Sequence, residues 1–134
     1  MNEKIITFET AKMLKNKMFM VPCIHGYDYN GRLHSSMDYT GEPFFTVSDM
    51  ANAKDNTGQD HYLAPSLPFV QTWLREEHNI YVVPSPERPT HDDFIYSFQF
   101  YVYDDRGIIL HDGVGFDSWE DALERGVQEA FKTI

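Results

Sequence analysis

Apolar residues recur at helical spacing in three stretches of the chain. A helix turns once in about 3.6 residues, so this spacing predicts helices over residues 8–19, about 66–78 and 119–134. Thr7 is expected to cap the first helix and Asp117 or Ser118 the last, because oxygen side chains there accept the free backbone amides of the first turn. Asn79 suits a left-handed residue at the end of the middle helix.

Gly126 falls inside the apolar stripe of the last predicted helix. A glycine in a helix interior weakens the helix by about 1 kcal/mol relative to alanine. A helix packed unusually close to a sheet would explain its presence, because a side chain would then have no room.

Runs of aromatic and β-branched residues predict strands that meet at turns. Residues 24–33 predict a hairpin around Asn30-Gly31, since an Asn-Gly pair supplies the positive φ angles of a tight turn. Residues 94–103 form the clearest strand. A four-residue loop follows, with Gly107 expected in a left-handed conformation, and it leads to a return strand over 108–112. A short strand over 80–83 is expected to stop at the next proline.

These elements predict an α+β fold in the order α-β-β-(loop)-α-β-β-β-α, with about three helices on an antiparallel or mixed sheet. The chain length of 134 residues fits one domain, 1–134. A flexible loop is expected at about 50–62, and the pattern over 35–63 leaves the structure there undecided.

The net charge of −10 is unevenly distributed along the chain. Residues 1–34 hold five basic and three acidic side chains, so the remainder carries a net charge of −12. Because such a field repels phosphate and anionic lipid, we do not expect nucleic acid or a membrane as a partner. The single cysteine and the absence of an apolar leader at the N-terminus predict a cytoplasmic protein.

Three segments together carry a resemblance to other proteins. They read Thr-Ala-Lys-Met-Leu-Lys at 10–15, Ala-Pro at 64–65 leading to Trp-Leu-Arg-Glu-Glu-His-Asn-Ile at 73–80, and Ser-Trp-Glu-Asp-Ala-Leu-Glu-Arg-Gly at 118–126. The chain thereby resembles a group of short uncharacterised proteins of gut-bacterial genomes and prophage-like regions. The matching residues are helix caps and packing positions, so the resemblance implies a mobile-element accessory protein and no catalytic residues.

Histidine and aspartate side chains offer a candidate metal site. Its members would be His91, Asp93, His111 and Asp112. Pairing Tyr103 with Ile108 across the hairpin would place His111 opposite Phe100. That position lies nine residues from His91, or roughly 30 Å along a straight strand. We therefore expect no metal or cofactor, and a small metal-dependent hydrolase is the alternative.

Other catalytic arrangements find less support. Cys23 has only His25 nearby in sequence, which favours a small buried thiol over a nucleophile. The segment Gly113-Val114-Gly115 is too short for a nucleotide-binding fingerprint.

The aromatic strand has two apolar faces. Alternation places Phe94, Tyr96, Phe98, Phe100 and Val102 on one face, which we expect to be core. Tyr101, Tyr103, Ile108 and Leu110 would share the opposite face. Either a helix covers this second face or it is a surface for protein interaction or self-association. The predicted function is a non-catalytic accessory protein acting through such contacts, and an acidic inhibitor that mimics DNA is a further alternative.

Overall fold

A computed structural model describes residues 4–17, 19, 21, 23–35, 60–87 and 97–134, and it confirms the α+β class. Where the sequence predicts one domain, the chain divides into two compact units. The N-terminal unit is Ile5–Ser66, and the C-terminal unit is Leu67–Ile134 together with Met1–Lys4. We describe each unit by itself.

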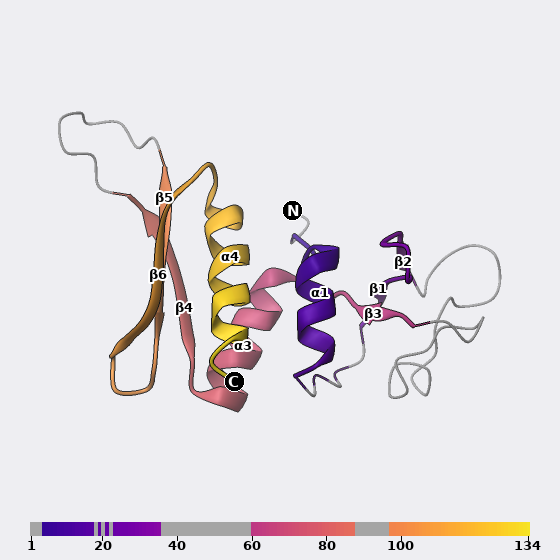
Figure 1. The fold of residues 1–134 in the computed structure, drawn as a ribbon, viewed down its shortest axis with the longest axis horizontal. Helices are drawn as coiled ribbons and strands as arrows, with labels where there is room; N and C mark the ends of the chain where they lie inside the picture. The colour runs from indigo at the N-terminus through magenta and orange to yellow at the C-terminus, as the bar shows by residue number, and fades with distance from the viewer. Residues whose placement is uncertain (1–3, 18, 20, 22, 36–59, 88–96) are drawn as a thin grey trace. The chain divides into compact units, whose positions relative to one another are not determined.

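The N-terminal unit combines one described helix with a small sheet (Figure 1). Its elements are α1 (Phe8–Lys15), β1 (His25–Tyr27), β2 (Leu33–Ser35) and β3 (Tyr62–Leu63), and the antiparallel sheet has the order β2-β1-β3. The predicted cap is confirmed, because Thr7 Oγ1 accepts the Thr10 amide at 3.4 Å. The helix ends at Lys15 instead of residue 19, since the amide of Lys17 bonds the carbonyl three residues before it and closes the last turn.

The turn between β1 and β2 differs from the predicted Asn-Gly turn. Only Gly31 has a positive φ, of 86°, so the loop spans Asp28 to Arg32. Asp28 Oδ1 accepts the amides of Asn30 and Arg32, both at 2.9 Å, and this side chain holds the loop closed. The carboxylate therefore fixes the turn, and a second left-handed residue is not needed.

The core of the N-terminal unit forms between α1 and the sheet. Ile6, Ala11, Leu14 and Ala64 are almost fully buried. The Tyr27 hydroxyl donates to the carbonyl of Ile6 at 2.6 Å, which ties β1 to the chain before the helix. Residues 36–59, and with them most of the loop expected at 50–62, lie outside the described residues, but Tyr62 belongs to β3, a strand that the sequence pattern did not indicate.

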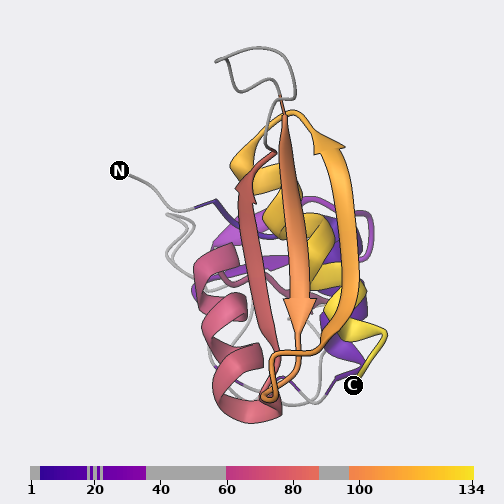
Figure 2. The same cartoon turned by 90° about the vertical axis from the view of Figure 1, so that its left-hand side faces the viewer.

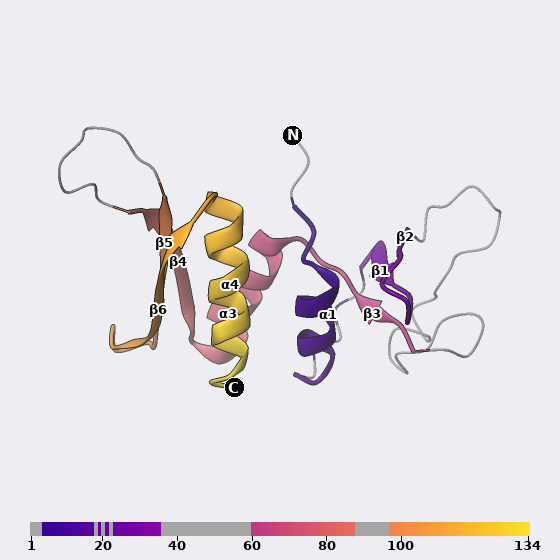
Figure 3. The ribbon, with the colours of Figure 1, turned by 45° about the horizontal axis from the view of Figure 1, so that its top comes forward.

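The C-terminal unit is a three-stranded antiparallel sheet with two helices. Its elements are α3 (Leu67–His78), β4 (Tyr81–Pro86), β5 (Phe98–Tyr103), β6 (Ile109–Phe116) and α4 (Trp119–Phe131), and the sheet order is β4-β5-β6. Figures 1 and 3 show α3 and α4 on the same side of this sheet. Asn79 is left-handed with φ 55°, as predicted for the end of α3.

Helix α4 packs very close to the sheet, which is what Gly126 predicts. A Cβ atom on Gly126 would lie 2.6 Å from Cγ1 of Val82 and 3.2 Å from the ring of Phe100. The N-cap is Ser118, whose Oγ accepts the Asp121 amide at 3.0 Å. The close approach buries Val82, Phe100 and the apolar stripe of α4 together.

Two strands run further than the sequence predicts. β4 continues through Pro84 to Pro86, and β6 continues through Gly113 to Phe116. A proline fits an edge strand where its nitrogen points away from the neighbouring strand. Gly113 fits because a Cβ there would lie 2.4 Å from the Phe100 ring.

The register of the β5–β6 hairpin also differs from the prediction. Tyr103 pairs with Ile109, not with Ile108, and His111 pairs with Val102, not with Phe100. The hairpin loop is one residue longer than predicted, which pairs Tyr103 with Ile109, and a register shift between Val102 and Tyr103 adds the second residue of the difference at His111. Residues 94–96 of the predicted strand lie outside the described residues.

Candidate functional site

The sheet of the C-terminal unit has one face turned away from its helices. We call this the outer face. Its apolar members are Tyr81 and Val83 from β4, Tyr101 and Tyr103 from β5, and Ile109 and Val114 from β6. Figure 2 looks onto this face, with α4 behind the strands.

The two faces differ sharply in burial. Phe100 and Val102 are 2% and 0% exposed beneath α4, as predicted for the core side of β5. On the other side, Val83 is 43% exposed and Ile109 is 51% exposed. Because neighbouring residues of a strand point to opposite faces, the pattern follows directly from the alternation.

Cross-strand pairs connect the side chains of the outer face. Tyr81 lies opposite Tyr103, and Val83 lies opposite Tyr101. The rings of Tyr101 and Tyr103 are 5.9 Å apart between centroids, within the range of aromatic contact. The result is a continuous apolar and aromatic surface across three strands.

The structure brings two of the four predicted interaction residues together on this surface. Tyr101 and Tyr103 lie on the outer face, whereas Ile108 lies in the hairpin loop before β6 begins. Leu110 is the extra residue at the register shift. Ile109 takes the position predicted for Ile108.

Sequence reasoning missed the contribution of β4 to the outer face. Val82 and Pro84 are buried and Tyr81 and Val83 are exposed, but all four side chains are apolar or aromatic, so the sequence itself shows no alternation there. The contribution of β4 was also hidden because a proline is normally read as the end of a strand.

Polar groups surround the apolar part of the outer face. Gln99 donates to Ser85 at 3.3 Å, and Asp112 is exposed opposite Tyr101. None of the strands Tyr81–Pro86, Phe98–Tyr103 and Ile109–Phe116 contains lysine or arginine. The charge at this surface is therefore negative.

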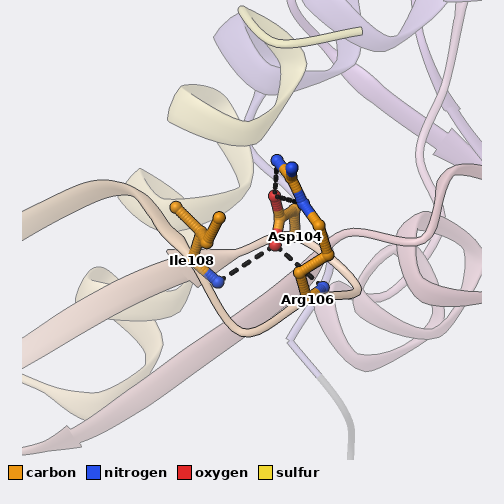
Figure 4. A network of polar contacts seen from close by, with 3 residues as sticks. All are labelled: Asp104, Arg106 and Ile108. Atoms are coloured by element: carbon orange, nitrogen blue, oxygen red, sulfur yellow. Dashed lines mark hydrogen bonds and ion pairs between the residues drawn. The ribbon is translucent and has the colours of Figure 1, made fainter.

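An aspartate organises the hairpin loop beside the outer face (Figure 4). Asp104 Oδ1 accepts the amides of Arg106 and Ile108 at 2.9 and 3.0 Å, and Asp104 Oδ2 accepts the Arg106 side chain at 2.7 Å. The Arg106 hydrogen bond and the Ile108 amide lower the pKa of Asp104, so the carboxylate stays charged. This loop repeats the arrangement at Asp28, and Gly107 has the positive φ, of 80°.

The two units differ in charge. The C-terminal unit contains six basic and fourteen acidic side chains, a net charge of −8. The N-terminal unit contains five basic and seven acidic side chains, a net charge of −2. The acidity of the chain is thus concentrated in the unit that carries the outer face.

The candidate metal ligands do not come together as a described site. His91 and Asp93 lie outside the described residues. His111 and Asp112 are neighbours on β6, so their side chains point to opposite faces of the sheet. Among the residues that the structure describes, no group of three or more His, Cys, Asp or Glu side chains could hold a metal ion.

His111 instead joins β6 to the end of α4. Its Nε2 lies 2.9 Å from Thr133 Oγ1, and its Nδ1 lies 3.7 Å from the Glu129 carboxylate. The hydrogen bond from Lys132 lowers the pKa of Glu129, and the nearby positive charge of Arg125 also lowers it, against the effect of desolvation. The cluster holds the last turn of the helix against the sheet.

Cys23 has the properties of a structural thiol. Burial raises its pKa to about 11, and its Sγ donates to the carbonyl of Val21 at 3.3 Å. At neutral pH almost none of it is thiolate, the form that acts as a nucleophile.

In comparisons with protein-family models, curated proteins and solved structures, the chain matched none of them. Among the described residues, no helix combines the length and the apolar character that crossing a bilayer requires.

Proposed function

We propose that this protein acts by binding another protein through the outer face of the C-terminal sheet. The observation that carries the proposal is an aromatic and apolar surface on three paired strands, over which no helix of the described part of the unit lies. Contiguous exposed apolar surfaces usually mark interaction sites, because leaving them in water gives the folded chain no benefit. Tyrosine is also among the residues that contribute most to binding at protein interfaces.

The charge of the C-terminal unit defines the chemistry of the partner. Its net charge of −8 favours a protein whose contact surface is apolar at the centre and basic at the rim. It disfavours nucleic acid, and it opposes close approach of a second copy of the same unit. We place this binding in the cytoplasm, where an accessory protein of a mobile element would meet host proteins.

The hydrolase alternative receives no support from the described ligands. His111 contacts the end of α4, and Asp112 faces away from it, so the two side chains cannot act on one substrate or metal together.

The test compares tyrosines at the surfaces of the two units, the half-buried Tyr101 and Tyr103 and the exposed Tyr29. The double variant Tyr101→Ser and Tyr103→Ser removes the aromatic centre of the outer face, and Tyr29→Ser, at a residue 55% exposed in the N-terminal unit, is the matched control. Each protein is recovered gently from its host and examined by native mass spectrometry and thermal unfolding.

We expect the wild type and the Tyr29 variant to carry the same added protein mass, and the double variant to lose it. Two tyrosines at an interface centre correspond to a loss of affinity of about 100-fold or more. The unfolding temperature should fall less than it would for a core substitution, because Tyr101 and Tyr103 are only half-buried and their main contact is with each other. Retained partner mass together with lost stability would mean that these tyrosines serve the fold and would contradict the proposal.

A further inference from the structure

The free edge of β4 is closed to a further strand. Glu87 donates its amide to the carbonyl of Ser97 at 2.9 Å, which makes these residues a hydrogen-bonded pair of the antiparallel ladder. Bonded pairs recur at every second residue, so the backbone groups of Val82, Pro84 and Pro86 point to the free edge. The prolines have no amide hydrogen, and the Val82 carbonyl accepts Gln71 Nε2 at 2.7 Å.

The free edge of β6 is open. The same alternation directs the backbone of Phe100 toward Gly113. Beyond Gly113 the register shifts by one residue, and the shift falls at Gly115, whose φ of 85° is typical of a bulge with glycine at its first position. The Gly115 amide donates to the Glu87 carboxylate at 3.2 Å. Val114 precedes this bulge and keeps the alternation that Asp112 follows. The amides and carbonyls of Asp112 and Val114 therefore point outward. Among the described residues no strand pairs with this edge.

The outer face alone is smaller than the surface that a stable interface buries on one partner. Three strands of about six residues give a projected area of roughly 14 Å by 20 Å, or about 300 Å². A stable interface buries about 800 Å² on each partner. A strand added at β6 would widen the surface by about 4.8 Å and supply backbone hydrogen bonds besides side-chain contacts.

We infer that β6 accepts an extended segment of the partner protein as a fourth strand of the sheet. The inference rests on the proposed function and specifies how the partner binds. The segment alternates apolar side chains, which continue the outer face, with basic side chains that meet Asp112 and the acidic field of the unit. A second copy pairing through β6 would bring the two Asp112 carboxylates and two acidic units together, so another protein is the occupant.

The test uses a displayed library of random ten-residue peptides selected on the full chain, and the enriched peptide is then synthesised. Its affinity is measured for wild type, Val114→Pro and the matched control Val114→Ser. Val114 is 64% exposed, and proline at an outward-pointing amide of an edge strand is compatible with the strand. Two further versions of the peptide carry N-methyl groups on alternate amides. One version blocks the edge of the peptide strand that would pair with β6, and the other blocks the opposite edge. The test therefore does not depend on the folding of the proline variant.

We expect the enriched peptide to alternate apolar and basic residues. It should bind the proline variant about tenfold more weakly than the serine variant, and only one of the N-methylated peptides should lose binding. Three results would each overturn the inference. The first is failure to enrich such peptides. The second is equal binding to both Val114 variants together with no difference between the N-methylated peptides, and the third is a dimer of the chain that the proline disrupts.

The same peptide, measured on the Tyr101→Ser and Tyr103→Ser variant, separates the two proposals. If the peptide bound that variant more weakly but neither the proline nor N-methylation had an effect, the outer face would remain the binding site and only strand addition at β6 would be ruled out. Equal binding to every variant would remove both.

Discussion

Replacing Gly126 by alanine should destabilise the protein, although the same change stabilises most helices. In an open helix the substitution gains about 1 kcal/mol. Here the new methyl group would lie 2.6 Å from Cγ1 of Val82, whereas carbon atoms pack at about 3.5–4.0 Å. Val82 is β-branched and 2% exposed, so it cannot rotate away. The helix must therefore move outward by roughly 1 Å.

The expected magnitude follows from two opposing contributions. Overpacking a core costs about 1–3 kcal/mol, which exceeds the gain in helix propensity. We expect a net loss of about 1 kcal/mol, which lowers the unfolding temperature by about 4–8 °C in a unit of this size. Urea denaturation followed by circular dichroism measures the free energy of unfolding directly.

A second substitution provides the control. Val82→Ala removes the atom that the new methyl group would strike, at a cost of about 2 kcal/mol for the lost burial. In that background Gly126→Ala should be neutral or stabilising, and the coupling between the two positions should exceed the additive error of about 0.5 kcal/mol. If Gly126→Ala alone raised the stability by the full helix propensity, the close approach of α4 to the sheet would be refuted.

Two further predictions concern titratable groups of the N-terminal unit. Desolvation raises the pKa of Asp28, but the His34 ring and the backbone amides of Arg32 and Asn30 outweigh it and leave the pKa below its usual value. The stabilisation that this carboxylate contributes is therefore fully present above the unfolded pKa of about 3.9 and is lost as the pH falls through the folded pKa. Below about pH 4 the unfolding temperature should therefore fall more steeply with decreasing pH in the wild type than in Asp28→Asn. For Cys23, a pKa raised from 9.0 to about 11 means about 100-fold less thiolate at neutral pH. Alkylation by iodoacetamide should therefore be about 100-fold slower in the folded protein than in urea. Equal rates in the two conditions would contradict the burial of this thiol.

The features predicted correctly from the sequence are those fixed by local chemistry. Thr7 and Ser118 cap their helices because the acceptor and the amide that it binds lie three residues apart. Asn79 and Gly107 have positive φ angles, which few other residues adopt at low cost. Gly126 was informative because a costly residue inside a strong helical pattern requires a tertiary cause.

The turns show where local reasoning stopped short. An Asn-Gly pair predicts two left-handed residues, yet the Asp28 side chain closes a five-residue loop with only one. The hairpin at Asp104 has the same aspartate and glycine at the same separation. The common pattern could have been read by comparing the two loops, since a carboxylate that accepts two amides stabilises this geometry.

The outer face was predicted only in part because strand register is a long-range property. Tyr101 and Tyr103 follow from alternation within one strand, but their neighbours depend on pairing with β4 and β6. A one-residue shift moves Ile109 into the position expected for Ile108. No periodicity within a single segment encodes that shift.

The composition of the C-terminal unit is best understood when its exposed surface and its charge are considered together. Tyr101 and Tyr103 on the outer face are only half-buried, since burial beneath α4 is confined to the opposite side of the sheet. Such a face favours self-association, and the net charge of −8 on the unit opposes it. In the function proposed above, the same charge would attract a basic partner. Pro84 and Pro86 would block strand addition at β4 and direct it to β6. On this proposal, the charge would disfavour self-association and the blocked edge would restrict where a partner strand can pair.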